Sequence, residues 1–263
     1  MCLIAFAWRV HPRYPLVFAA NRDEFLDRPS ARADFWTDAP EVLGGRDLEK
    51  GGSWFALDHR GRWAAVTNYR EGKRAPESAR SRGALIGDYL RGAQTASACA
   101  ASVQAQAAAF PGFNLLVADS ADLFYLSNRD SGPVAVSPGI HALSNGHLDT
   151  PWPKVRKARE RLSTLMDADQ ETLTTGLFEL LFDRAQAPDH ELPQTGVGLD
   201  WERTLSAPFI VSEGYGTRAS TVLLIDREGK ALFEERSFVQ GGRASGRQQF
   251  SLNLADPLRQ VNR

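Results

Sequence analysis

Residues 1–24 read MCLIAFAWRVHPRYPLVFAANRDE, and they carry the strongest structural signal in the chain. Two apolar runs, Cys2–Trp8 and Leu16–Ala20, flank a turn that contains Pro12 and Pro15. Short apolar runs separated by turn residues predict a pair of antiparallel strands. We therefore expect a β-hairpin that begins at the second residue. The charged stretch Asn21–Arg28 predicts a loop directly after this hairpin.

Short strands and helices alternate in blocks along the rest of the chain. Helical spacing or composition predicts helices within 81–109, over 153–166 and over 171–187, and Pro153 opens the second of these. Further strands are predicted at 54–58, 62–68, 113–118, 123–128, 134–137, 140–143, 209–211, 218–226 and 231–238. Blocks of strands and helices without a βαβ unit predict an α+β fold with mainly antiparallel sheets.

The domain organisation predicted from this pattern is one domain over residues 1–242. No repeat, low-complexity linker or sharp change of composition divides it. Residues 243–263 form a polar tail rich in Gln and Arg, which we expect to be loosely held. The basic segment Lys154–Arg161 predicts a solvated face of its helix.

Composition excludes several classes of protein. The 263 residues carry 31 Lys+Arg against 32 Asp+Glu, a net charge of −1, so no overall attraction to nucleic acid is expected. No apolar stretch approaches the ~18 residues of a membrane span, and the first apolar run is a poor signal peptide. We therefore expect no integral membrane association. Two cysteines and five histidines without ligand spacing predict neither a disulfide framework nor a metal site. A reducing, cytoplasmic setting fits best, and no cofactor is predicted.

A cysteine at position two has a special chemistry. Removal of Met1 would leave the Cys2 thiol beside a free α-amine, whose ordinary pKa of ~7.7–8.0 suits a general base. The pair can then attack a carbonyl carbon without a histidine. The simpler alternative is that Cys2 fills the first strand as a small buried residue.

An ordered series of short motifs favours the first alternative. The motifs are Met1-Cys2, Asn21–Glu24, Gly44–Asp47, Gly51–Trp54, Thr67-Asn68, Ser81–Gly83, Leu143–Asn145, Thr150–Lys154 and Gly216–Arg218. Together they resemble the NRDE family, also called the transport and Golgi organisation protein 2 family, over residues 1–240. That family is similar in turn to N-terminal nucleophile hydrolases, which implies a four-layer αββα sandwich.

The resemblance implies a set of catalytic residues. By motif these are Cys2, Arg22, Asp23 or Glu24, Asn68, Asn145 and Arg218. Arg22 would favour the thiolate by its charge, and one of the two acids would hold the ammonium. The register of Asn21–Glu24 leaves the choice between these acids open.

The remaining members of this set would act on the substrate. Asn68 and Asn145 could donate hydrogen bonds to an oxyanion, although turn formation or strand capping explains asparagines equally well. Arg218 could position the site or bind a substrate carboxylate.

The glycine-flanked loop Arg46–Lys50 could line a pocket. No Lys-Ser or Lys-Thr follows its glycines, so nucleotide binding is unsupported, and a solvated hairpin tip is the alternative. We predict Arg46, Asp47, Trp54 and Trp152 as substrate-binding residues.

Two functions from different classes follow. The first is a hydrolase or acyltransferase that acts on an amide, thioester or related acyl substrate through Cys2. The alternative is a binding or chaperone protein on the same scaffold, for acyl-CoA, lipid or haem, which the resembled family has been linked to handling.

Overall fold

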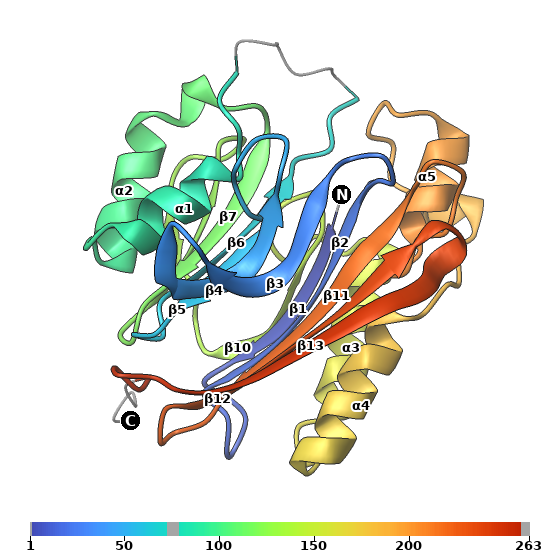
Figure 1. Ribbon diagram of the computed structural model, residues 1–263. Coiled ribbons are helices and arrows are strands. Elements are labelled where there is room, and N and C mark those ends of the chain that lie inside the picture. The colour runs from blue at the N-terminus through green and yellow to red at the C-terminus, as the bar shows by residue number, and fades with distance from the viewer. Residues whose placement is uncertain (1, 73–78, 259–263) are drawn as a thin grey trace.

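Two antiparallel β-sheets lie face to face in the computed structural model, which describes residues 2–72 and 79–258 (Figure 1). The six-stranded sheet has the order β10 (Gly139–Leu143), β1 (Cys2–Trp8), β2 (Leu16–Phe25), β11 (Tyr215–Ile225), β12 (Lys230–Val239) and β13 (Arg243–Asn253). The seven-stranded sheet has the order β3 (Ser30–Trp36), β4 (Ala39–Asp47), β5 (Phe55–Asp58), β6 (Trp63–Asn68), β7 (Phe113–Ala118), β8 (Leu123–Ser127) and β9 (Val134–Ala135). The predicted hairpin Cys2–Trp8 with Leu16–Ala20 is the pair β1–β2.

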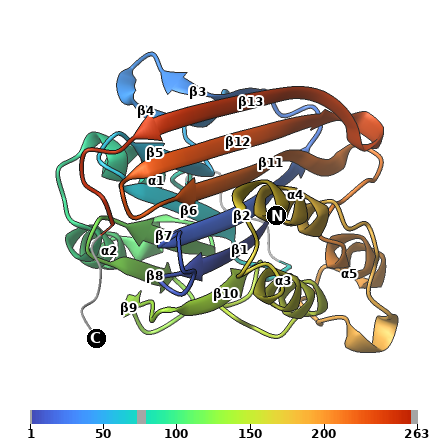
Figure 2. The same ribbon diagram turned by 90° about the horizontal axis from the view of Figure 1, so that it is seen from below.

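Helices cover the outer face of each sheet. The described α-helices are α1 (Ala84–Arg91), α2 (Ala96–Ala105), α3 (Pro153–Ser163), α4 (Gln170–Leu181) and α5 (Leu199–Ser206). Helices α1 and α2 pack on the seven-stranded sheet, whereas α3 and α4 pack across β1, β2, β10 and β11 (Figure 2). The four-layer αββα prediction is therefore confirmed.

Burial on both faces explains why β1 is continuously apolar. Ile4, Phe6 and Trp8 enter the core between the sheets, while alternate residues such as Leu3 enter the core under α3 and α4. Successive side chains of a strand point to opposite faces, so a strand in the middle of four layers needs apolar residues at every position.

The charged segment predicted as a loop is instead part of a strand. Asn21–Phe25 continues β2 and pairs with β11 along its length, and its first two residues also pair with β1. Asn21 is accommodated because its amide nitrogen donates to the carbonyls of Leu181 and Pro208, each at 2.8 Å, and its oxygen accepts from Ser220. Buried polar groups are tolerated where partners satisfy them.

The segment after residue 242 also differs from the prediction. Residues 243–253 form β13 along the whole of β12, so they are not loosely held; residues 259–263 lie outside the described part. This edge strand is defined by backbone pairing, and its mostly exposed polar side chains carry no hydrophobic signal.

Four further elements depart from the sequence analysis. Strands β3 and β4 and helix α5 were not predicted, and residues 209–211 form a single bridge between Val211 and Gly216 where a strand was expected. Strand β3 lies at the edge of its sheet with an irregular burial pattern, so its sequence lacks the alternation of a half-buried strand.

A buried carboxyl group joins the two sheets. Glu235 of β12 accepts a 2.7 Å hydrogen bond from the N–H of Ala33 in β3, and its other oxygen is 3.4 Å from the Thr221 hydroxyl. Burial raises the pKa of Glu235 to about 7, although these hydrogen bonds and the charge of Arg22 oppose the rise.

This pKa predicts a pH-dependent stability. Between the ordinary carboxyl pKa of 4.5 and about 7, the folded protein holds a proton that the unfolded chain releases. The free energy of unfolding should therefore fall as pH rises through this window, by roughly 2–3 kcal/mol relative to Glu235→Gln. Urea unfolding of both proteins at several pH values checks this. Parallel pH profiles would contradict it.

Candidate functional site

Cys2 and Arg22 are direct partners across β1 and β2. Directly opposed residues of antiparallel strands project from the same face, so both side chains point toward the seven-stranded sheet, as Ile4 does. The Arg22 guanidinium lies 4.0 Å from Glu24. Burial raises the pKa of the Cys2 thiol, and the backbone N–H of Asp23 and the charge of Arg22 act in the opposite direction. The structure thus brings the predicted nucleophile and its predicted cation together.

Of the two acids that the sequence left open, Asp23 is the buried one. Its side chain is 1% exposed and accepts a 2.7 Å hydrogen bond from the hydroxyl of Thr217 on β11. Burial raises the pKa of Asp23, and the charge of Lys154 and the Thr217 hydrogen bond oppose this. Glu24 is partly exposed and lies near Arg22 and Arg28. Asp23 is therefore the acid with the environment of a site residue.

The two predicted asparagines meet where the sheets end. Asn68 ends β6, and its backbone carbonyl accepts a 2.8 Å hydrogen bond from the side-chain amide of Asn145, which follows β10. The neighbouring Ser144 donates to the carbonyl of Cys2 at 3.1 Å and accepts at its own carbonyl from Thr67 at 2.7 Å. Asn145 therefore connects the end of β6, at Asn68, to the end of β10, which pairs with the strand that begins with Cys2.

Arg218 is the extra residue of a β-bulge. The register of β11 against β2 shifts between Thr217 and Ala219, which leaves Arg218 without an opposite residue. Its guanidinium donates to the carbonyls of Phe25, Leu26 and Arg28 at 2.8–3.2 Å. The structure places Arg218 against the turn after β2, and its charge acts on Arg22.

The predicted substrate-binding residues separate into two groups. Trp54 lies beside the site, with its ring centroid 4.2 Å from the Arg22 guanidinium. Gly45 permits this position, because a Cβ there would overlap the Trp54 ring. Asp47 borders the same cavity but accepts hydrogen bonds from Arg28 at 2.8 and 2.9 Å.

The second group does not line the cavity that includes Cys2. Arg46 pairs with Asp38 at 2.7 Å on the surface beside Trp36. Trp152 stacks 4.8 Å from Arg70, and it precedes helix α3. The structure does not bring Arg46 into contact with the residues around Cys2.

Sequence analysis missed a cluster of buried charged residues whose charges act on Asp23. Lys154, predicted on a solvated helix face, is 2% exposed, and Arg70 and Glu202 form a buried ion pair of 2.6 Å. Burial lowers the pKa of Lys154 to about 8, with Asp23 as the strongest opposing charge. The sequence does indicate that Lys154 lies in the first turn of its helix, because it directly follows Pro153 and a Pro often occupies the first helical position.

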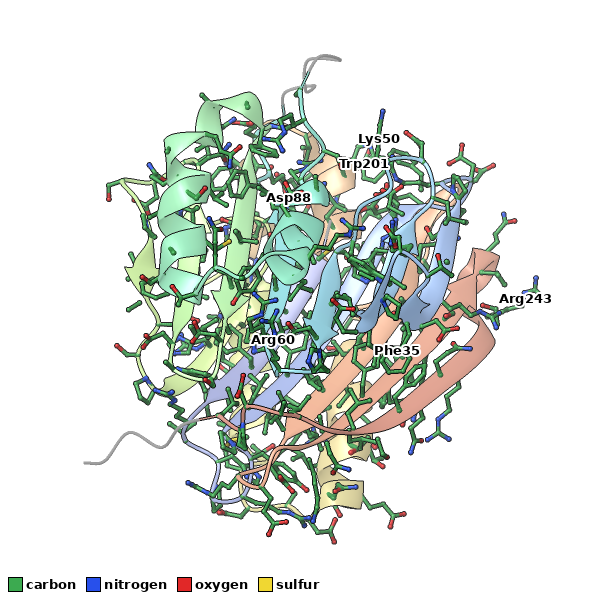
Figure 3. All side chains as sticks on the ribbon, turned by 60° about the vertical axis from the view of Figure 1, so that its left-hand side comes forward. Phe35, Lys50, Arg60, Asp88, Trp201 and Arg243 are labelled. Atoms are coloured by element: carbon green, nitrogen blue, oxygen red, sulfur yellow. The ribbon has the colours of Figure 1, made fainter. Side chains whose placement is uncertain are left out.

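Two adjoining cavities open at this end of the molecule. The nucleophile cavity, of about 590 Å³, includes Cys2, Arg22 and Trp54 in its wall. The aromatic cavity, of about 1250 Å³, includes Tyr69, Phe110, Trp201 and Tyr215. Both include Phe25, Asn68 and Arg82, so they meet there. Figure 3 shows Lys50, from the first cavity, and Trp201, from the second, at the same end of the molecule.

Two other kinds of site were searched for in residues 2–72 and 79–258. No group of three His, Cys, Asp or Glu side chains in these ranges could hold a metal ion. Within the same ranges, no helix has the length and apolar character needed to span a membrane.

The sequence pattern described as transport and Golgi organisation 2 matches residues 1–240. The chain belongs to the transport and Golgi organisation 2 family. The homolog from Bos taurus is 35% identical over 261 residues, covering 91% of this chain and 94% of its own. The Homo sapiens homolog is 34% identical with the same coverage, and the Drosophila melanogaster protein is 29% identical over 90% of this chain and 92% of its own. The family resemblance inferred from the motifs is confirmed.

Two solved structures are similar to this member of the transport and Golgi organisation 2 family. One is the Caenorhabditis elegans N-acylethanolamine-hydrolyzing acid amidase ortholog, with a TM-score of 0.48 and 13% identity over 85% of this chain and 92% of its own. The other is the C2A mutant of the conjugated bile acid hydrolase from Clostridium perfringens, with a TM-score of 0.46 and 9% identity over 100% of both chains.

The position of Asn145 in this family member predicts a structural effect. Asn145→Ala removes the hydrogen bond to the half-buried Asn68 carbonyl, so the free energy of unfolding should fall by about 0.5–1.5 kcal/mol. Denaturant unfolding measures this, with the exposed Asn253→Ala as the matched control. Equal stability of both variants would show that Asn145 does not hold the strand ends together.

Proposed function

We propose that this protein is an N-terminal-cysteine hydrolase or acyltransferase acting on an amide, thioester or related acyl substrate. The observation that carries the proposal is the pairing of Cys2 with Arg22 at the wall of a cavity, with Asp23 buried next to them. Met1, whose removal the reaction requires, lies outside the described residues. The catalytic roles of Cys2, Arg22, Asp23, Asn68 and Asn145 belong to this proposal.

The first half of the reaction forms an acyl-enzyme. The Cys2 α-amine accepts the thiol proton, and the sulfur attacks the substrate carbonyl carbon, forming a C–S bond and an oxyanion. In this proposal the side chain of Asn68 donates to that oxyanion; Asn68 borders both cavities, and Asn145 holds its backbone. Collapse of the intermediate breaks the bond to the leaving group, which takes the proton from the ammonium.

The second half regenerates the thiol. Water, or an acceptor in an acyltransferase, loses a proton to the amine and attacks the thioester carbon. The C–S bond breaks, and the sulfur recovers the proton from the ammonium. The α-amine of Cys2 therefore acts first as a general base and then as a general acid.

The adjoining cavities fit a substrate with an apolar acyl part. The scissile carbonyl would lie beside Cys2 and Asn68, and the apolar part would extend past Phe25 toward Trp201 and Tyr215. Aromatic surfaces that line a cavity bind such groups through apolar area removed from water. A reducing compartment favours a free thiol, so we propose a cytoplasmic location.

The size of the aromatic cavity also favours the second candidate function. A cavity of about 1250 Å³ is large enough to retain an acyl, lipid or haem-like ligand without turnover. In a binding protein of this kind, Cys2 would have no chemical part.

The first test combines intact mass with thiol labelling. The purified native protein should lack Met1 and gain one adduct from brief treatment with iodoacetamide near pH ~7. Cys2→Ala should abolish the adduct, while Cys99→Ala should leave it, because Cys99 lies on the buried face of α2, is 3% exposed, and has a thiol pKa raised by burial to about 11. These two cysteines are the only ones in the chain.

Either result decides between the two functions. Labelling confined to Cys2 would support the nucleophile and justify a screen of acyl amides and thioesters. Retained Met1 with no adduct would exclude it, and extraction of a bound ligand from wild type and Cys2→Ala alike would then support the binding function.

A further inference from the structure

Lys154 occupies a position that fold stability does not explain. It lies in the first turn of α3, directly after Pro153, and is 2% exposed. No residue in the described part of the chain accepts a hydrogen bond from its ammonium group. A buried cation without hydrogen bonds is costly, and the N-terminus of a helix disfavours positive charge further. Residues that violate local rules in this way concentrate at functional sites.

The surroundings of Lys154 place it beside the nucleophile. Helix α3 packs on β1 and β10, and the chain between β10 and α3 donates a hydrogen bond to the Cys2 carbonyl through Ser144. The charged groups that act on Lys154 are Asp23 from β2, Arg70 after β6, Cys2 from β1 and Glu202 from α5. Its ammonium therefore reaches the end of β1 from the helical layer.

The charges of this cluster are already balanced. Arg70 is paired with Glu202 at 2.6 Å, so among the described residues Asp23 is the acid that offsets Lys154. On the opposite face of the sheet, Arg22 lies 4.0 Å from Glu24, and Arg82 adds a positive charge near Cys2. Burial raises the pKa of Tyr215 well above its ordinary value, which leaves its phenol neutral.

We propose that Lys154 is a positioning residue that keeps the α-amine of Cys2 unprotonated until the thiol supplies a proton. The inference rests on the proposed function. If the amine took a proton from water, the cluster would gain an uncompensated positive charge in a buried place. If the proton comes from the thiol, the thiolate offsets the ammonium and no net charge is added. Lys154 thus favours transfer of the thiol proton to the amine over uptake of a proton from water.

The expected effect of removing the charge has a defined sign. In Lys154→Met, Asp23 loses the buried side-chain cation that acts on it most strongly, and the amine takes up a proton in preference to the carboxyl group, since its ordinary pKa is about 4 units higher. The resting site then holds a thiol beside an ammonium, which cannot act as a base. Deprotonation of the site moves to higher pH.

The test measures the rate of Cys2 alkylation by iodoacetamide as a function of pH, in a Cys99→Ala background with Met1 absent by intact mass. The acid limb of the wild-type profile should have a midpoint below the ~7.7–8.0 of an ordinary α-amine. Lys154→Met should raise that midpoint by about 1 to 2 pH units, which lowers the rate about tenfold or more on the acid side. Lys157→Met, an exposed lysine of the same helix, should leave the profile unchanged.

The outcomes separate this inference from the proposed function. Equal midpoints in the wild type and Lys154→Met would overturn the role of Lys154 while leaving the nucleophile intact. If Lys154→Met fails to fold, the wild-type profile alone still tests the role of Lys154. A wild-type midpoint at or above ~8 would overturn that role. Lys154→Arg, if folded, should keep the wild-type midpoint. Retained Met1 in the wild type would overturn the proposed function, and this inference with it.

Discussion

The buried carboxyl group of Asp23 is the constraint on which the site depends. A charged side chain inside a sheet that is covered on both faces must be matched by hydrogen bonds and opposite charge. Thr217 supplies the hydrogen bond from the next strand, and Lys154 supplies the charge from the helical layer. The bulge directly after Thr217 turns Arg218 toward the carbonyls beyond β2. The arrangement of three elements therefore follows from one buried acid.

The second constraint is that the ends of both sheets must stay together around Cys2. Ser144 and Asn145 provide this connection, since one donates to the Cys2 carbonyl and the other to the Asn68 carbonyl. Both residues are buried, and the two hydrogen bonds lie partly out of contact with water. Cys2, the proposed nucleophile, and Asn68, proposed to face the oxyanion, are thus held by strand ends, as precise chemistry requires.

The sequence predicts the strands and helices that have a clear apolar pattern. It does not predict segments whose structure depends on backbone pairing or on distant side-chain partners. The hairpin β1–β2 was predictable because its two strands are continuous apolar runs around a turn, whereas the four layers were implied by the family resemblance. The strand character of Asn21–Phe25 was not, because its polar residues are matched by distant groups such as Leu181. Lys154 was misplaced for the same reason: the acid that offsets it, Asp23, is far away in the sequence.

The measurement that bears most directly on the account is trapping of the acyl-enzyme. The native protein would be mixed with a long-chain acyl thioester, quenched in acid, digested and analysed by mass spectrometry. The account predicts a single acyl group on the peptide that begins with Cys2, and none after Cys2→Ala. An unmodified N-terminal peptide in protein that lacks Met1, or acylation at Cys99 alone, would contradict the claim that Cys2 is an activated nucleophile.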